Sequence, residues 1–464
     1  MGRVRVAASA LAFFAAAVLA PALALAAQPK ALVEGRLARP LKAEIERAVG
    51  VSKSRPTTRL DARRRAREAA QAAIAALRSE GYYDYEVEAE VGAGTPPTAL
   101  VRVTPGPLTR IGQARIEWDG PPPDPATIAS GAAALDLPAG TPGRAAEVLA
   151  AEGRVAASLH AHGYADAATR PREVVVDHAD HTMSPTFRFA AGALVRLDGV
   201  EVTSKGRTRA PWVASLAPWK RGSIYDPADL AKLERRLRDT GVFNAVTVAL
   251  APANETKGGL RPVVVSLVDR APRTIELGAG YSTSEGAGLD AKWSFYNLLG
   301  RADTVALTGR LAQIQQKLDA ELDLPSWGGA DRIFRTGGDV FADHTVAFDD
   351  DGLGLRAGVT RHFTKTTFIA YGAAVDVVDT REKTAINPNG VAVGQELKLA
   401  IFSTSASFAL DRSDNILDPT RGWRLQAEAD PTYVTGDRVL PYLKLEAQAS
   451  GYLPLGRLAD TVLA

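Results

Sequence analysis

The chain has 464 residues, and its 55 lysines and arginines nearly balance its 53 aspartates and glutamates, for a formal net charge of +2. That balance gives no reason to expect a nucleic-acid partner, because binding of a phosphate backbone usually needs a basic face. Cysteine is absent, which excludes disulfides and thiolate chemistry, and aromatic residues are only 6% of the chain.

Residues 1–27 have the pattern of a secretory signal peptide. Arg3 and Arg5 form its basic start, and an apolar run follows from Val6 to Leu19. Ala24-Leu25-Ala26 supplies the small residues of a cleavage site. An uncleaved anchor is the alternative, but the apolar run is short for a spanning helix and a proline interrupts its end. No later segment is long and apolar enough for a transmembrane helix.

Three similar blocks of about 80 residues follow, over residues 28–106, 107–193 and 194–272. Each block has a helical pattern that stops at a glycine able to adopt the left-handed cap, and an extended run comes next. The three helices are predicted over Leu60–Arg78, Arg144–His160 and Pro227–Arg238, and the three glycines are Gly81, Gly163 and Gly241.

The helix of the third block is the best marked of the three. Asp226 suits the N-cap and Pro227 the first turn. Leu230, Leu233 and Leu237 then lie on one face, which predicts that this face packs on a sheet.

Strands and shorter helices complete each block. Opening strands are predicted over Ile111–Trp118 and Val195–Val202, with a short one in the first block. Apolar returning strands are predicted around Val101 and Val103, Phe187 and Phe189, and Val263, Val265 and Leu267. Shorter helices are predicted around Leu41, Ile45 and Val49, over Thr127–Leu135, and over Pro211–Leu216. The order strand, helix, helix, strand, strand resembles that of the POTRA domain, with a generic α+β array as the alternative.

From residue 273 the pattern changes to alternating polar and apolar positions, in segments of the length that a tilted membrane strand needs, about 9–11 residues. Leu318, Leu322 and Leu324 alternate with Asp319, Glu321 and Asp323. Buried carboxylates would need partners, whereas a water-filled lumen keeps them hydrated, so residues 273–464 are predicted to form part of an antiparallel transmembrane β-barrel. A soluble sheet with one wet face is the alternative. Between Glu396 and Leu410 the apolar phase shifts, which predicts a β-bulge.

The most specific motif lies between two of these segments. Its Asp-Pro turn and following glycine suit the end of one strand and the start of the next. The motif residues are Asp411, Asp414, Asn415, Leu417, Asp418, Pro419, Thr420, Arg421 and Gly422. The stretch resembles the barrel hairpin signature of the bacterial surface-antigen family, which includes BamA and TamA, although the arginine stands one place early and Ser413 precedes Asp414. Residues 296–301, Tyr-Asn-Leu-Leu-Gly-Arg, similarly resemble an early barrel turn of the family.

The resemblance implies an outer-membrane assembly factor whose POTRA arm lies in the periplasm. Three POTRA-like blocks favour the TamA branch, which implies a TamB-like inner-membrane-anchored partner, nascent outer-membrane β-proteins as clients, and contact with outer-membrane lipid. The family's Val-Arg-Gly loop motif does not occur in this sequence. We therefore expect a C-terminally truncated chain, with roughly five or six further strands in the full-length protein.

The family further implies that the first barrel strand is a lateral gate. Its candidate residues are Thr274, Leu277, Gly278, Gly280 and Ser282. Glycine weakens a strand, and an exposed strand edge can template an incoming strand. The alternative is that this strand is only the closing seam of a rigid barrel.

Catalytic interpretations are weaker. His178 and His181 with Asp177 and Asp180, and the nearby His160 and His162, have the composition of a metal site, but a strand that runs into a polar turn explains them better. Gly-x-Gly pairs at 278–280 and 286–288 lack the helix that a nucleotide loop needs. We therefore predict no enzyme, catalytic residue, cofactor or metal. An export pore of the two-partner-secretion type and a soluble periplasmic scaffold remain as other functions.

Overall fold

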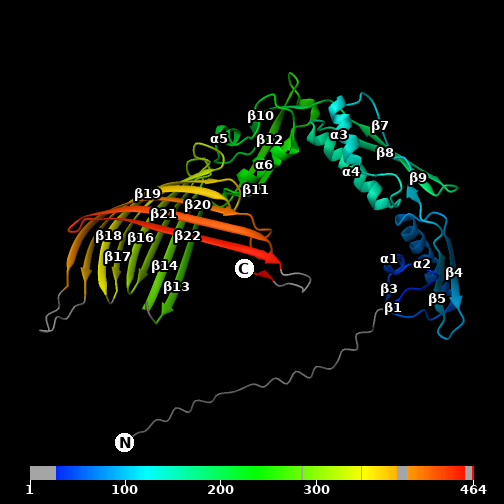
Figure 1. Ribbon diagram of the computed structural model, residues 1–464, viewed down its shortest axis with the longest axis horizontal. Coiled ribbons are helices and arrows are strands. Elements are labelled where there is room, and N and C mark those ends of the chain that lie inside the picture. Colours follow the sequence, from blue (N-terminus) through cyan, green and yellow to red (C-terminus); the bar gives the residue numbers. More distant parts are fainter. Residues whose placement is uncertain (1–27, 284–285, 346, 384–393, 455–461, 464) are drawn as a thin grey trace, which may run out of the picture. The chain divides into compact units, whose positions relative to one another are not determined.

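The computed structural model describes residues 28–283, 286–345, 347–383, 394–454 and 462–463 (Figure 1). The predicted signal peptide lies outside these residues. Contacts divide the chain into two compact units. Unit 1 holds the residues up to Ser158 together with Ala167–Ala191, and unit 2 holds Leu159–Asp166 and the residues from Gly192 onward. The block boundaries expected from the sequence remain predictions.

The first block of unit 1 packs two helices on a three-stranded sheet with the order β2-β5-β4, and β1 pairs separately with β3. The predicted apolar residues of the short helix and of the returning strand are buried, and alanines of the long helix pack against them. Small side chains let this helix approach the sheet closely. The elements are β1 (Gln28–Pro29), β2 (Leu32–Glu34), α1 (Arg39–Val49), β3 (Val51–Ser52), α2 (Arg59–Ser79), β4 (Glu86–Gly92) and β5 (Thr98–Thr104).

The second block is built around β9, which pairs in parallel with β6 and β7 and antiparallel with β8. The single opening strand predicted over Ile111–Trp118 is wrong, because the structure breaks it into β6 and β7 with a one-residue change of register. Pro185 of β9 has no N–H to donate at the break. The elements are β6 (Arg110–Ile111), β7 (Arg115–Trp118), α3 (Pro125–Leu135), α4 (Ala145–Ala161), β8 (Ala168–Asp177) and β9 (Thr182–Ala190).

The third block has the strand order β10-β12-β11 with its helices packed on the sheet. Asp226 caps α6 as predicted, since its carboxylate accepts from the Ala228 N–H at 2.8 Å. The predicted leucine face is buried, and Gly241 after the helix has φ 71°. The elements are β10 (Arg196–Val202), α5 (Ala210–Ser215), α6 (Pro227–Arg238), β11 (Phe243–Leu250), the 3₁₀ helix η1 (Ala253–Glu255) and β12 (Leu260–Asp269).

The rest of unit 2 is one sheet of eleven strands in which each strand is hydrogen-bonded to its neighbours in the chain. All of these pairs are antiparallel, which confirms the predicted fold class of α+β blocks followed by an antiparallel sheet. The strands are β13 (Arg273–Ser282), β14 (Gly286–Tyr296), β15 (Thr304–Ala312), β16 (Gln315–Pro325), β17 (Arg332–His344), β18 (Phe348–His362), β19 (Phe368–Glu382), β20 (Glu396–Asp411), β21 (Gly422–Gly436), β22 (Leu440–Pro454) and β23 (Val462–Leu463). Among the described helices, none has the length and hydropathy of a membrane span.

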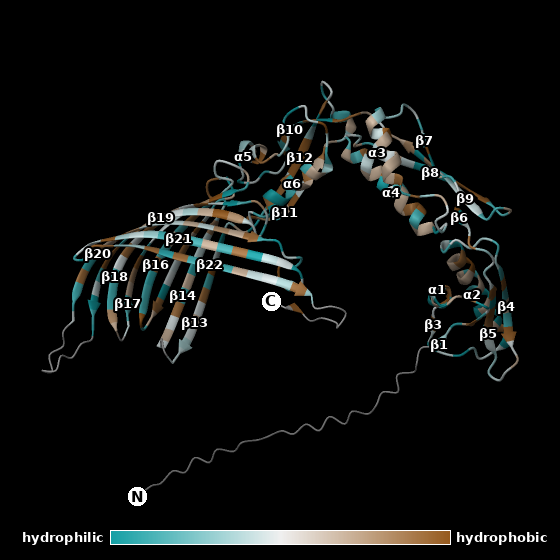
Figure 2. Ribbon diagram, viewed as in Figure 1, coloured by the Kyte–Doolittle hydropathy of each residue, from teal (hydrophilic) through white to brown (hydrophobic). Residues whose placement is uncertain are grey.

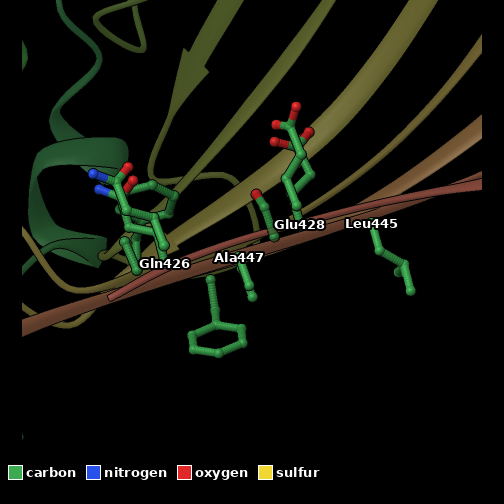
Figure 3. A pocket seen from close by; sticks show the side chains of 11 residues that line it. Gln426, Glu428, Leu445 and Ala447 are labelled. Atoms are coloured by element: carbon green, nitrogen blue, oxygen red, sulfur yellow. The ribbon is translucent and has the colours of Figure 1, made fainter. Parts of the chain in front are cut away.

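The two faces of this sheet differ in polarity. One face, the apolar face, carries exposed large side chains such as Leu277, Leu318, Leu355 and Leu445, and the other, the charged face, carries the predicted carboxylates. Figure 2 shows the alternation along β21 and β22. In Figure 3, Gln426 and Glu428 point to one side of the sheet, whereas Leu445 and Ala447 point to the opposite side.

The predicted bulge between Glu396 and Leu410 is wrong. Strand β20 pairs with β19 from Glu396 to Ala409 without a change of register. Phe402 and Phe408 lie on the apolar face, and Leu397, Leu399 and Ile401 lie on the charged face. The change of phase therefore marks apolar residues at one end of the charged face, not an inserted residue.

Candidate functional site

Strand β13 is the first strand of the large sheet, and it pairs with β14 along its whole length, from Arg273 opposite Phe295 to Ser282 opposite Gly286. Within the described residues it has no second neighbour. Leu277 is 80% exposed, the highest value among the large apolar side chains of this strand. The strand therefore combines a row of backbone groups on its outer edge with an apolar face.

The two glycines of β13 are not required by close packing. A Cβ on Gly280 would meet nothing within 4 Å, and one on Gly278 would come no closer than 3.7 Å to Asp290. Neither glycine has the positive φ that excludes other residues. Their effect on the strand is therefore to lower its stability, since glycine loses more backbone freedom on folding and packs no side chain.

The first residues of β13 are held by contacts in addition to the pairing with β14. The Thr274 hydroxyl donates to the Tyr296 hydroxyl oxygen at 3.0 Å, and the Tyr296 N–H donates to the Pro272 carbonyl at 2.9 Å. The Arg270 guanidinium lies 4.0 Å from the centre of the Tyr296 ring. This end of the strand is thus fixed to β14 and to the segment that leaves the third block.

The turn between β14 and β15 contains the residues that resemble a family turn, and two fully buried polar side chains organise it. The Asp303 carboxylate accepts from the N–H groups of Leu298 and Leu299 at 2.9 and 2.8 Å. Asn297 accepts from the Ala302 N–H at 2.9 Å and donates to the Thr208 hydroxyl of the third block at 2.7 Å. Sequence reasoning missed Asp303 and Thr208, because Asp303 follows the quoted motif and Thr208 is distant in sequence.

The turn between β20 and β21 contains the predicted hairpin signature, and Asp414 is its centre. The Asp414 carboxylate accepts from the Thr420 hydroxyl at 2.5 Å and from the Thr420 and Arg421 N–H groups at 2.9 and 3.0 Å. These hydrogen bonds, led by that of the Thr420 hydroxyl, lower the pKa of Asp414 to about 2. The turn is therefore organised around an ionised carboxylate throughout the physiological range.

The other motif residues divide into structural and exposed ones. Asn415 accepts from the N–H groups of Leu417 and Asp418 at 2.9 and 3.3 Å. Gly422 has φ 109°, and a Cβ there would lie 2.2 Å from the Arg412 carbonyl oxygen, so no other residue fits. Leu417 is 93% exposed, and no hydrogen bond of the Asp418 side chain occurs among the described residues.

Arg424 was not predicted as part of the motif, although it lies two residues beyond it. Its guanidinium contacts the Asp411 carboxylate at 3.2 Å and donates to the carbonyl oxygens of Asn415 and Ile416 at 3.0 and 2.7 Å. Asp411 and Arg424 are opposite each other in the β20–β21 register. The signature thus builds a turn that is closed by this ion pair.

The structure does not bring the hairpin signature next to the candidate gate strand in the sheet, because six strands, β14 to β19, separate β13 from β20. The β14–β15 turn and the β20–β21 turn do lie at the same end of the sheet. Because the chain alternates direction from strand to strand, the β14–β15, β16–β17 and β20–β21 turns all lie at the end of the sheet where β13 begins.

The charged face carries ion pairs, not only hydrated carboxylates. Arg356 donates to Asp319 at 2.6 Å, to Glu321 at 3.2 Å and to Asp339 at 2.9 Å. Arg335 donates to Asp323 at 2.6 Å. The three carboxylates that the sequence assigned to a wet face thus have cationic partners on β17 and β18.

Two of the histidines weighed as metal ligands lie beside a carboxylate of the first block. Both His178 and His181 contact Asp84 through Nδ1. The hydrogen bond from His178 is the main cause that lowers the pKa of Asp84. Asp177 ends β8 and accepts from the N–H groups of Ala179 and Asp180, as expected for a strand that runs into a polar turn. Among the described residues no cluster of three or more His, Cys, Asp or Glu side chains could hold a metal ion.

Residues 297–464 match the Omp85 superfamily domain, and residues 31–105 match domain 1 of the TamA POTRA domains. The structure is similar to that of BamA from Haemophilus ducreyi lacking POTRA domains 1–3, with a TM-score of 0.60 and 18% identity over 75% of this chain and 68% of that chain. CdiB from Escherichia coli matches with a TM-score of 0.39 and 15% identity, over 76% of this chain and 66% of that chain.

Proposed function

The chain belongs to the Omp85 superfamily, and we propose that within it the protein is a TamA-type assembly factor that helps β-barrel or autotransporter proteins enter the outer membrane. Members of this family insert proteins into the outer membrane or export them, and they are non-enzymatic. As a member, the protein lies in the outer membrane with its POTRA arm in the periplasm. The insertion role and the individual partners are the proposal.

The observation that carries the proposal is the character of β13. It supplies an outer edge with backbone donors and acceptors, an apolar face suited to lipid, and two glycines that packing does not require. A client strand that pairs with this edge satisfies its own backbone groups inside the membrane, where an unpaired group costs several kcal/mol. Strand addition of this kind gives affinity through the main chain and accepts many side-chain sequences.

The third block gives β13 a fixed base. Its residues Thr208 and Arg209 bond to the turn that follows β14, the latter through its N–H to the Gly300 carbonyl at 2.9 Å. We infer that the first hairpin stays in place on the third block while the outer edge of β13 pairs with a client. A TamB-like inner-membrane-anchored protein is the proposed partner of the assembly, supported by the TamA-type match of the first block.

Deletion of the gene and its complementation test this role. We expect loss of surface-exposed, folded autotransporter, assayed by protease accessibility in whole cells, and recovery when the protein is restored. The export-pore alternative predicts a different defect, in which one secreted substrate accumulates in the periplasm while autotransporters reach the surface normally. That second pattern, or normal levels of both kinds of substrate, would reject the assembly role.

A further inference from the structure

A groove on the apolar face of the sheet ends at an arginine. The groove lies over β19 and β20, has a volume of about 590 Å³, and is lined by apolar side chains that include Tyr371, Phe408 and Leu410. At the end of the sheet where β13 begins, the lining continues to Phe363 and Arg412. The groove is thus apolar along the membrane-facing strands and cationic at their end.

Two more arginines lie on the apolar face, at the same end of the sheet. Arg332 and Arg361 are directly opposite each other in the β17–β18 register, on the side that also carries Val340 and Leu353. The Arg361 guanidinium lies 4.9 Å from the centre of the Phe363 ring, which joins this pair to the groove. Like charges in directly opposed positions destabilise a sheet, so an anion bound to both guanidiniums would stabilise this arrangement.

No carboxylate of the described residues forms an ion pair with these arginines. Among these residues the Arg332 guanidinium donates only to the Gly328 carbonyl at 3.3 Å, and neither Arg361 nor Arg412 forms an ion pair. Arginines of the charged face, such as Arg335 and Arg356, pair with carboxylates. Two acids beside these arginines are paired elsewhere, because Asp331 binds Arg236 and Asp411 binds Arg424.

Aromatic side chains place this cluster at the depth of lipid headgroups. Trp327 is 47% exposed and stacks on Phe334 with ring centres 5.0 Å apart, and Phe363 is 53% exposed. Aromatic rings of this kind concentrate at the membrane–water interface, and arginine binds phosphate in a planar, bidentate manner.

We propose that Arg332, Arg361 and Arg412 bind the phosphate of an anionic phospholipid in the periplasm-facing leaflet, and that the groove between β19 and β20 takes one of its acyl chains. The groove decides between lipid and free phosphate, since a free anion gains nothing from an apolar channel beside the guanidiniums. The site would hold a lipid against the outer wall of the sheet, six to seven strands along from β13. It does not depend on the proposed assembly role.

The test is native mass spectrometry of the protein extracted from outer membranes in detergent and titrated with dioleoyl phosphatidylglycerol. The Arg361→Gln/Arg412→Gln variant should bind this lipid roughly 30-fold more weakly than the wild type, the change expected when two arginines at an anionic surface are removed. Phe408→Ala should weaken binding while it leaves the charge unchanged. The matched control is Arg438→Gln, which changes an exposed arginine at the opposite end of the strands, and it should bind the lipid as the wild type does.

Three results would overturn the site. Equal binding of phosphatidylglycerol by the wild type and the double variant would do so, with folding of both verified by heat-modifiable migration on gels. Equal binding of phosphatidylcholine and phosphatidylglycerol by the wild type would show that the site does not recognise an anionic headgroup. Displacement of the lipid by millimolar inorganic phosphate would make this a free-phosphate site. If the double glutamine variant does not fold, Arg361→Lys/Arg412→Lys retains the charge and should show an intermediate loss.

Discussion

Arg236, on helix α6 of the third block, holds Asp331, in the turn between β16 and β17, through Nε at 3.3 Å and Nη2 at 3.1 Å. The Arg236 side chain is only 13% exposed and also donates to the Leu216 carbonyl at 2.8 Å. Ala330 of the same turn packs against the core of the third block. Together with the contact between Asn297 and Thr208, this pair fixes the third block to two turns at the end of the sheet where β13 begins.

Loss of this ion pair should loosen the third block from the sheet. In Asp331→Asn the guanidinium keeps its carbonyl partner but loses its charged one, at a cost of about 1 kcal/mol or less for a half-exposed carboxylate. Spin labels on cysteines introduced at Lys232 and Lys365 should then give a broader distance distribution. Asp239→Asn, a neighbouring exposed aspartate at the end of α6, should leave the distribution unchanged. Equal widths for Asp331→Asn and the wild type would show that the pair does not hold the block.

Asp303→Ala should be among the most damaging changes in the sheet turns. It removes a fully buried acceptor and leaves the N–H groups of Leu298 and Leu299 without their partner, which costs roughly 1–3 kcal/mol per unsatisfied group. The temperature at which the folded form converts to the slower-migrating unfolded form on gels should fall by several degrees. Asp418→Ala, in the exposed part of the hairpin signature, should leave it unchanged. A normal transition for Asp303→Ala would contradict the role of this carboxylate.

The ion pair of Asp166 with Arg261 should make the stability of the POTRA arm depend on pH. Arg261 holds Asp166 through two bonds of 2.8 and 2.6 Å, and these lower the pKa of Asp166. Because the folded pKa lies below the unfolded one, the contribution is complete above about pH 4 and is lost as pH falls below that value.

Urea unfolding of residues 28–272 should therefore show a lower midpoint for Asp166→Asn than for the wild type at pH 7, and the difference should shrink below pH 4. Asp180→Asn, an exposed turn residue, is the control and should match the wild type at both pH values. A difference that stays constant between pH 7 and pH 3 would assign the effect of Asp166 to packing, not to its charge.

Gly280→Ala should strengthen β13 and slow the assembly of clients. The site is open and the backbone is ordinary, so alanine fits and removes an instability of roughly 0.5–1 kcal/mol. Gly309→Ala in β15 is the matched control, because its Cβ also meets nothing within 4 Å and β15 has neighbours on both sides. Pulse-chase measurement of autotransporter folding should show slower assembly for Gly280→Ala alone. Equal assembly rates for both variants would show that the stability of β13 does not control the assembly of clients.

Local signals in the sequence predicted the helices and strands well. The cap at Asp226 and the leucines of α6 appear in the structure as predicted, because helix capping and amphipathic spacing depend on neighbouring residues. The alternation of Leu318 to Leu324 likewise gives the two faces of β16 correctly. The predictions are wrong where the shape of a strand depends on residues of a different strand. The break between β6 and β7 follows from Pro185 on a different strand, and a pattern within Ile111–Trp118 holds no sign of it.

The candidate site was predictable in part for the same reason. The hairpin signature is contiguous, so its turn was identified as a motif, but the closing partner Arg424 lies across the strand pair. Thr208 and Asp331 bind groups about 90 residues away, and no local pattern indicates such a contact. Sequence alone also assigned Asp319 and Glu321 to water, whereas Arg356 reaches both from a strand two positions along.

The most direct test of the account is to capture a client strand on the outer edge of β13. Because the chain has no cysteine, Ser282→Cys supplies a single thiol on this strand, and Leu307→Cys on the doubly paired β15 supplies the matched control. A client barrel with a cysteine in its terminal strand is pulsed during assembly and oxidised. We predict a disulfide-linked adduct with Ser282→Cys that disappears as the client matures, and none with Leu307→Cys. Equal adducts at both positions, or none at Ser282→Cys while the client assembles normally, would contradict the proposal that β13 templates the incoming strand.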